Sequence, residues 1–205
     1  MTHYPKLSGQ LCYLSPCQVE DVEKWEAWFN DLEVSLPLGD EAYIPMSEEK
    51  MAEELRAALL HHAHIFSIIH KRTGELIGRC ILFNIDMVNQ TAMLGLVIGE
   101  KGYWGKGYGR EALRLLLDYG FNLLNLNNIM VGVFSFNHRA VRSYRALGFQ
   151  EIGRRREARL VAGKRYDVIL LDLLAEEFRA ANAGWGVATL LPSAGTARDA
   201  ERESK

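Results

Sequence analysis

The chain is poor in cysteine, in long apolar runs and in net charge, and each shortage excludes a class of protein. Its 205 residues include three cysteines, Cys12, Cys17 and Cys80, without the paired spacing of a zinc site or a redox motif. We therefore expect reduced thiols and a cytoplasmic location. No window approaches the roughly eighteen apolar residues of a membrane helix, and residues 1–10 hold no signal-peptide core, so we expect no membrane association. A formal net charge of −2 predicts no nucleic-acid partner, because phosphate contacts need an excess of Lys and Arg.

Metal ligands are equally sparse. His61 and His64 are close in sequence but have no acidic or cysteine partner nearby, so we expect no metal site. The one local basic cluster, which runs from Arg139 to Arg159, is interpreted either as a solvated face or as part of a ligand site.

What the chain does have is a glycine-rich turn between a strand-like segment and a helix-like one, within residues 93–117. Gly102, Gly105, Gly107 and Gly109 permit positive φ and close approach of a ligand to the backbone. They lead into the N-terminus of a helix, where free N–H groups and the helix dipole favour an anion. The pattern predicts a phosphate cradle, with a flexible surface loop as the alternative.

Two common phosphate cradles do not fit this turn. A P-loop needs Ser or Thr after its Lys, but Lys106 is followed by Gly107. A dinucleotide-binding turn needs Gly-x-Gly-x-x-Gly, but here the third glycine, Gly109, comes one residue early, and residues 120–129 contain no acid for a ribose. Nucleoside triphosphates and nicotinamide dinucleotides are therefore disfavoured.

Apolar periodicity predicts a single α/β (α+β) domain over residues 1–183, followed by a mobile tail over residues 184–205. Strands are expected at 11–14, 65–69, 75–85, 91–99, 129–134, 149–155 and 164–174. Helices are expected from Ser15-Pro16 to Leu32, at 47–59, after the glycine turn, at 138–147 and at 175–182. They would form a mixed, mostly antiparallel sheet of about six or seven strands with helices on both faces.

A second pair of residues lies downstream of the turn. Asn137 and Tyr144 are seven residues apart, so a helix that begins at Asn137 presents both on nearly the same face. Two interpretations are open: the pair serves one ligand, or Asn137 only caps the helix while Tyr144 only packs.

These two segments together resemble a known family. Residues 98–109, with Tyr-Trp-Gly-Lys-Gly-Tyr-Gly, and residues 137–149, Asn-His-Arg-Ala-Val-Arg-Ser-Tyr-Arg-Ala-Leu-Gly-Phe, are similar to the acetyl-CoA signature of the GNAT superfamily of N-acetyltransferases. The likeness is greatest to the branch that contains the ribosomal-protein alanine and diamine acetyltransferases, and it covers residues 11–178.

The resemblance implies a central strand pair that splays apart to admit acetyl-CoA as cosubstrate, with acetyl transfer to a primary amine of a protein N-terminus or a small molecule. Tyr144 would give a proton to the departing sulfur, and Asn137 would bond the pantetheine arm. Arg142 or Arg145 would meet the ribose phosphate. The other implied cosubstrate contacts are Leu96, Val97 and Ile98 along the strand and Trp104, Gly105, Lys106, Gly107, Tyr108, Gly109 and Arg110 in the turn. The protein would be a monomer or homodimer.

The sequence departs from the family at two positions. Met93 stands where relatives usually carry a Glu, and Ala140 stands where a Ser is common. The usual base is therefore missing, and Asp86, Glu100, Glu157 and Asp167 are possible substitutes that the sequence does not rank. A catalytically weak acyl-CoA sensor on the same fold is the alternative function that Met93 suggests.

The acceptor is not readable from the sequence. The segments expected to face it are residues 25–45, 86–90 and 160–166, which are aromatic and mixed in charge. A polyamine site would want more carboxylates, although Asp31, Glu33, Asp40 and Glu41 supply some.

Overall fold

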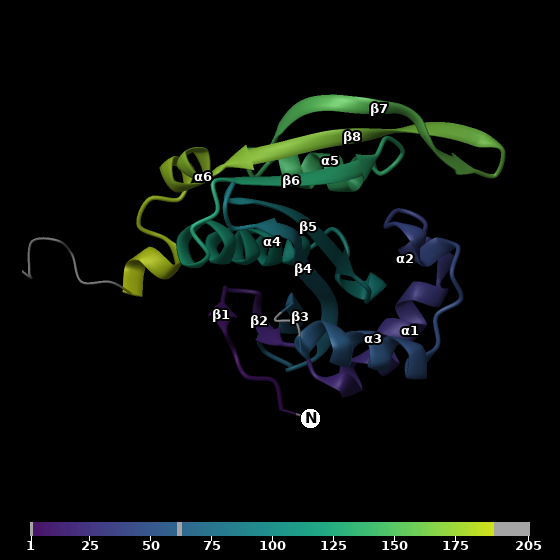
Figure 1. The fold of residues 1–205 in the computed structure, drawn as a ribbon. Helices are drawn as coiled ribbons and strands as arrows, with labels where there is room; N and C mark the ends of the chain where they lie inside the picture. The colour runs from purple at the N-terminus through teal and green to yellow at the C-terminus, as the bar shows by residue number, and fades with distance from the viewer. Residues whose placement is uncertain (1, 61–62, 191–205) are drawn as a thin grey trace, which may run out of the picture.

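The structure is a computed structural model that describes residues 2–60 and 63–190. One sheet of eight strands, in the order β1-β2-β3-β4-β5-β6-β8-β7, runs through the molecule (Figure 1). The strands are β1 Leu7–Ser8, β2 Cys12–Pro16, β3 His64–His70, β4 Leu76–Asp86, β5 Thr91–Ile98, β6 Asn128–Phe134, β7 Gln150–Val161 and β8 Lys164–Leu174. The predicted mixed, mostly antiparallel sheet is confirmed, and the additional strand is the two-residue β1.

Helices cover both faces of this sheet. They are α1 Val22–Asn30, α2 Leu32–Ser35, α3 Glu48–Leu60, α4 Tyr108–Asp118, α5 His138–Arg145 and α6 Ala175–Ala181. One core lies under α4, α5 and α6, where Leu113, Leu116 and Leu117 share one face of α4 at helical spacing. A second core lies on the opposite face, where Trp25 and Phe29 of α1 pack with α3.

The two central strands separate along their length. β5 and β6 run parallel and pair only through Thr91↔Asn128, Ala92↔Ile129 and Met93↔Met130. Beyond residue 93, β5 keeps β4 as its partner up to Ile98, while β6 continues beside β8. The predicted splayed pair is therefore present, and it leaves one edge of β5 unpaired from Leu94 to Ile98.

The C-terminal segment stays packed beyond the predicted domain boundary. The guanidinium carbon of Arg114 lies 3.8 Å from the ring centre of Trp185, and Val187 donates its N–H to Asp118 Oδ2 at 2.8 Å. Described structure therefore continues past the predicted boundary at residue 183, as far as Leu190. Residues 191–205 lie outside the described part of the chain, as do His61 and His62. Within that part, no helix is long and apolar enough to cross a membrane.

Candidate active site

The unpaired edge of β5 offers backbone groups of alternate residues. Gly99 donates its N–H to Ile77 O at 3.0 Å, so odd-numbered residues of β5 point their main-chain groups toward β4. Leu94, Leu96 and Ile98 consequently face the gap. The Ile98 carbonyl is already occupied, because it accepts a hydrogen bond from Trp104 Nε1 at 2.7 Å. Leu96 thus keeps both of its main-chain groups available to a ligand.

This alternation corrects one expectation. Val97 was expected to pair with pantetheine through its backbone, but its main-chain groups face β4. Its side chain still lines the gap.

The glycine turn has the conformation that its composition predicts. Gly105 has φ +73° and Gly107, the residue before α4, has φ +92°, both in the region that favours glycine. The backbone N–H groups of residues 105–110 find no acceptor within the part of the chain that the structure covers. A run of free donors at a helix N-terminus is suited to bind an anion such as a pyrophosphate.

A carboxylate fixes the start of α4 in place. Glu111 accepts hydrogen bonds from three consecutive backbone N–H groups, those of Gln10 at 2.8 Å, Leu11 at 2.7 Å and Cys12 at 2.8 Å. The turn between β1 and β2 is thereby attached to the first turn of α4. The free donors of the glycine turn are therefore held on a rigid support.

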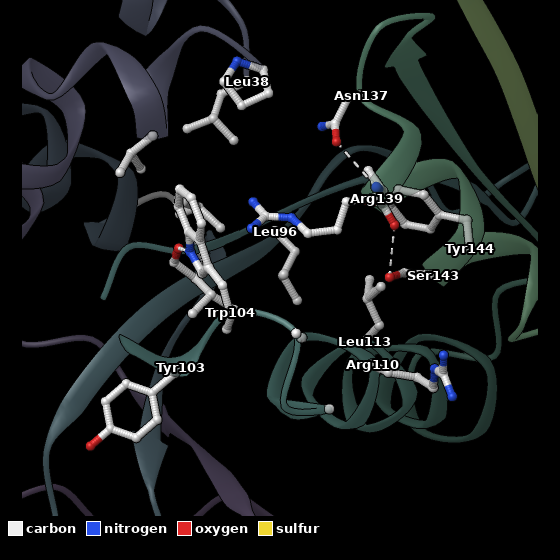
Figure 2. A pocket seen from close by; sticks show the side chains of 18 residues that line it. Leu38, Leu96, Tyr103, Trp104, Arg110, Leu113, Asn137, Arg139, Ser143 and Tyr144 are labelled. Carbon is white, nitrogen blue, oxygen red and sulfur yellow. Dashed lines mark hydrogen bonds between the residues drawn. The ribbon is translucent and has the colours of Figure 1, made fainter. Parts of the chain in front are cut away.

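Asn137 both caps α5 and faces the gap. Its Oδ1 accepts the N–H of Ala140 at 3.1 Å, which is the cap bond, and this use leaves Nδ2 free to donate (Figure 2). The two interpretations drawn from the sequence are therefore compatible, because one amide can cap the helix and still contact a ligand.

Tyr144 lies two helical turns further along α5. Its ring is buried and packs edge-on against Phe149 at 5.3 Å. Its hydroxyl makes no hydrogen bond with any residue that the structure describes. Burial raises the pKa of the Tyr144 phenol, so the group keeps its proton at neutral pH.

Two adjoining cavities meet at Tyr144. The first, of about 200 Å³, lies between β5, the glycine turn and α5, and the second, of about 310 Å³, lies between the splayed strands and residues 37–41. We call them the turn cavity and the strand cavity. Both are lined by Pro37, Leu38, Leu96, Val97, Asn137, Ala140 and Tyr144. Two ligands that enter from opposite sides would therefore meet beside the Tyr144 side chain.

Most of the predicted turn residues line the turn cavity, but three predicted contacts do not. Tyr108 packs against His70 and Tyr103 instead, and Lys106 and Arg142 are exposed and line neither cavity. Arg145, the alternative phosphate ligand, pairs with Glu151 at 2.7 Å.

Arg139 is a charged lining residue that the sequence indicated only as part of the basic cluster and not as a cosubstrate contact. Its guanidinium carbon lies 4.0 Å from the ring centre of Trp104, so α5 and the glycine turn touch across the turn cavity (Figure 2). Its position two residues after Asn137, inside the basic cluster, was the available signal.

None of the four possible bases lines the turn cavity or the strand cavity. Asp86 accepts hydrogen bonds from Val88 and Asn89 in its own turn, and Glu100 is bonded to Lys24 at 2.9 Å. Glu157 and Asp167 bond each other within the hairpin of β7 and β8, through the Glu157 N–H. The strand cavity is instead lined by the carboxylate of Glu41 and by the apolar side chain of Met93.

Comparison with known proteins places this geometry in a family. Residues 12–150 match the family described as Acetyltransferase (GNAT) domain. The chain belongs to the GNAT acetyltransferase family. It is 33% identical over 169 residues to the uncharacterized N-acetyltransferase p20 of Bacillus licheniformis, a match that covers 80% of this chain and 93% of that one. It is 31% identical over 121 residues to the spermidine N(1)-acetyltransferase of Escherichia coli K12, over 59% of this chain and 64% of that one.

The GNAT fold is also shared with solved structures. The spermidine N-acetyltransferase of Vibrio cholerae in complex with CoA and spermine superposes with a TM-score of 0.72 over 83% of this chain and 99% of that one, at 24% identity. Membership of the family makes this protein an N-acetyltransferase with acetyl-CoA as its cosubstrate. Among the residues that the structure describes, no group of three or more His, Cys, Asp or Glu side chains is arranged to hold a metal ion.

Proposed function

We propose that this GNAT protein acetylates the primary amine of a small molecule bound in the strand cavity. The observation that carries the proposal is that the two cavities share the lining around Leu96 and Tyr144. An amine in the strand cavity then meets the cosubstrate in the turn cavity, and holding both in one geometry replaces a bimolecular encounter.

Residues 36–43, which we call the roof of the strand cavity, favour a small amine over a protein N-terminus as the acceptor. Arg159 Nη2 donates to Gly39 O at 2.9 Å, and Tyr43 Oη donates to Leu160 O at 3.2 Å. Arg159 is also enclosed by the rings of Tyr43 and Phe134 at 4.2 and 4.3 Å. These contacts attach residues 36–43 to the hairpin of β7 and β8, so this wall of the strand cavity is held in place, which suits a small amine better than a polypeptide that needs the wall to move aside.

Each residue around the turn cavity has an assigned role in this proposal. The free N–H groups of residues 105–110 bind the pyrophosphate, and Leu96 pairs with the pantetheine arm as a neighbouring strand would. Asn137 Nδ2 donates to the same arm, and Arg139, which lines the turn cavity as Arg110 does, replaces the exposed Arg142 as a cation for the cosubstrate.

The chemistry needs an acid and a route for the amine proton. Acetyl-CoA supplies an acetyl thioester, whose C–S bond breaks as the amine nitrogen forms the C–N bond. The Tyr144 hydroxyl donates its proton toward the departing sulfur, because its raised pKa keeps it protonated. The attacking ammonium first loses a proton, and Glu41 is the lining carboxylate placed to take it.

An acceptor panel tests this function. The protein is mixed with acetyl-CoA and, in turn, a polyamine, a set of amino acids and a peptide with a free N-terminus, while free thiol and acetylated product are measured. Turnover of small amines in excess of thioester hydrolysis is expected. Turnover of the peptide alone would contradict the small-molecule acceptor.

The second candidate is an acyl-CoA-binding regulatory module, which the apolar Met93 in the strand cavity favours. It predicts measurable CoA binding without thiol release for any amine. For the location, we propose a reducing compartment such as the cytoplasm, because all three cysteines are buried free thiols.

A further inference from the structure

An arginine without a counter-ion faces the strand cavity. Arg79 lies on β4, and its guanidinium carbon is 4.9 Å from the ring centre of Trp25 and 4.8 Å from that of Phe29. Nowhere in residues 2–60 and 63–190 does a carboxylate form an ion pair with this guanidinium, and no acceptor there hydrogen-bonds it. Among the described residues, the cation is therefore held in position by two aromatic rings and by no ion pair.

This arrangement leaves the binding edge of the guanidinium available. Burial lowers the pKa of Arg79, but an arginine stays charged at neutral pH, and no ion pair offsets the cost of removing this charge from water. Ring stacking uses the flat faces of the guanidinium and not its N–H groups. Those N–H groups form a fork that matches a carboxylate with two parallel hydrogen bonds.

A single carboxylate shares the cavity with Arg79. Glu41 lies in the roof, and its side chain folds over Gly39, where an added Cβ would come within 2.9 Å of Oε2. It is close enough to raise the pKa of Arg79 but forms no ion pair with it. The nearby Asp31 and Glu33 are both bound by Lys101, at 2.7 and 2.5 Å. The strand cavity thus presents one cation and one anion, separated from each other.

Apart from Asn137 and Tyr144, the remaining wall of the strand cavity is apolar. Ile81 and Phe83 follow Arg79 on the same face of β4, because side chains of a strand alternate. Met93 of β5 and Val131 and Val133 of β6 complete this wall. A ligand matched to it carries a negative group, a positive group and an apolar side chain.

We propose that the acceptor is an α-amino acid with an apolar side chain, whose carboxylate binds Arg79 and whose ammonium faces Glu41. The proposal rests on the proposed function. In the reaction the ammonium loses a proton, the nitrogen forms the bond to the acetyl carbon, and the C–S bond breaks. The products are the N-acetyl amino acid, the free thiol and one released proton. A polyamine fits less well, because its positive charges would lie against Arg79.

Acceptors that differ only in the carboxylate test the proposal directly. L-leucine and L-methionine are compared with their carboxamides, both as acceptors in the thiol-release assay and as ligands in calorimetry with CoA present. We expect each acid to exceed its amide by about tenfold to a hundredfold in kcat/KM and in affinity, because the amide cannot form the charge-assisted pair.

Variants then locate the effect. Arg79→Met keeps an apolar stem between the two rings and should bring the acid-to-amide ratio to about one, while Arg79→Lys keeps the charge and should retain part of the ratio. The control is Arg72→Met, at an exposed turn position outside the cavity, which should leave the ratio unchanged. Unfolding midpoint and acetyl-CoA affinity are measured on each variant to confirm an intact fold.

The outcomes separate this proposal from the function on which it rests. Equal use of acid and amide by the unaltered protein would overturn the carboxylate assignment without any variant, and so would an unchanged ratio in Arg79→Met. Thiol release with amines other than amino acids would leave the N-acetyltransferase function standing but reject this acceptor class. Arg79-dependent binding of L-leucine without thiol release would reject acetyl transfer to it and retain the carboxylate site.

Discussion

Replacement of two glycines in the turn between β5 and α4 should have opposite effects on stability and a shared effect on cosubstrate binding. Gly107 has φ +92°, where an alanine costs roughly 1–2 kcal/mol, while its added Cβ would meet only Leu11 Cδ1 at 3.4 Å. Gly109 lies inside α4 with ordinary φ, and its Cβ would contact Ile98 Cγ1 at 3.5 Å and Leu96 Cδ2 at 3.7 Å. An alanine there gains up to about 1 kcal/mol of helix propensity.

Gly107→Ala should therefore lower the free energy of unfolding. If the turn relaxes to avoid this strain, acetyl-CoA binding should weaken instead, and the losses of stability and of binding free energy should together come to about 1–2 kcal/mol. Gly109→Ala should be as stable as the unaltered protein or slightly more so. It should nevertheless bind acetyl-CoA more weakly, because its methyl group enters the turn cavity. Urea unfolding and calorimetry with acetyl-CoA measure both quantities. Unaltered acetyl-CoA affinity in both variants would refute the assignment of this turn to the pyrophosphate.

Three further variants test other parts of the site and its support. Tyr144→Phe should lower kcat by about 10²- to 10⁴-fold with little change in stability or acetyl-CoA affinity, and an unchanged kcat would remove Tyr144 as the acid. Because burial raises the Tyr144 pKa, the unaltered enzyme should not lose this acid below about pH 10. Glu111→Ala should lower the free energy of unfolding by about 2–4 kcal/mol in urea titrations, since three backbone donors lose a charged acceptor; a loss under about 0.5 kcal/mol would mean that water replaces it. Asp118→Ala should release the segment around Val187, seen as faster proteolysis after α6, whereas equal cleavage rates would show that Trp185 packing alone holds it.

Most of the residues that line the turn cavity could be brought together from the sequence because they are local in it. The glycine turn and the N-terminus of α4 are consecutive, and Asn137 and Tyr144 share one short helix, so spacing alone brings their groups together. Even there, spacing did not reveal which residues of β5 face the open edge. That depends on the hydrogen-bond register with β4, which excludes the Val97 backbone.

The acceptor half could not be read in this way. Arg79 is recognisable as a ligand-facing cation only when α1 places Trp25 and Phe29 over it, and Glu41 reaches the cavity from a separate loop. The contacts of Trp185 and Val187 could not be read from the sequence for a similar reason. Its composition is that of a tail, but Asp118 and Arg114 of α4 bind its first residues. For the Arg79 surroundings and for the C-terminal segment alike, the deciding contacts join segments that lie far apart in the sequence.

The splay of β5 from β6 explains how one strand can serve both substrates. Backbone direction and side-chain direction both alternate along β5 with a period of two residues. The even-numbered residues therefore turn their main chain to the open edge, while Met93 and Val97 turn their side chains to the strand cavity. A carboxylate at position 93 would lie at the last pair before the strands separate, Met93↔Met130, among apolar walls. Because position 93 is a methionine, the carboxylate that lines the strand cavity comes from Glu41 in the roof. In the proposed complex, the Met93 side chain is then free to pack against an apolar part of the acceptor.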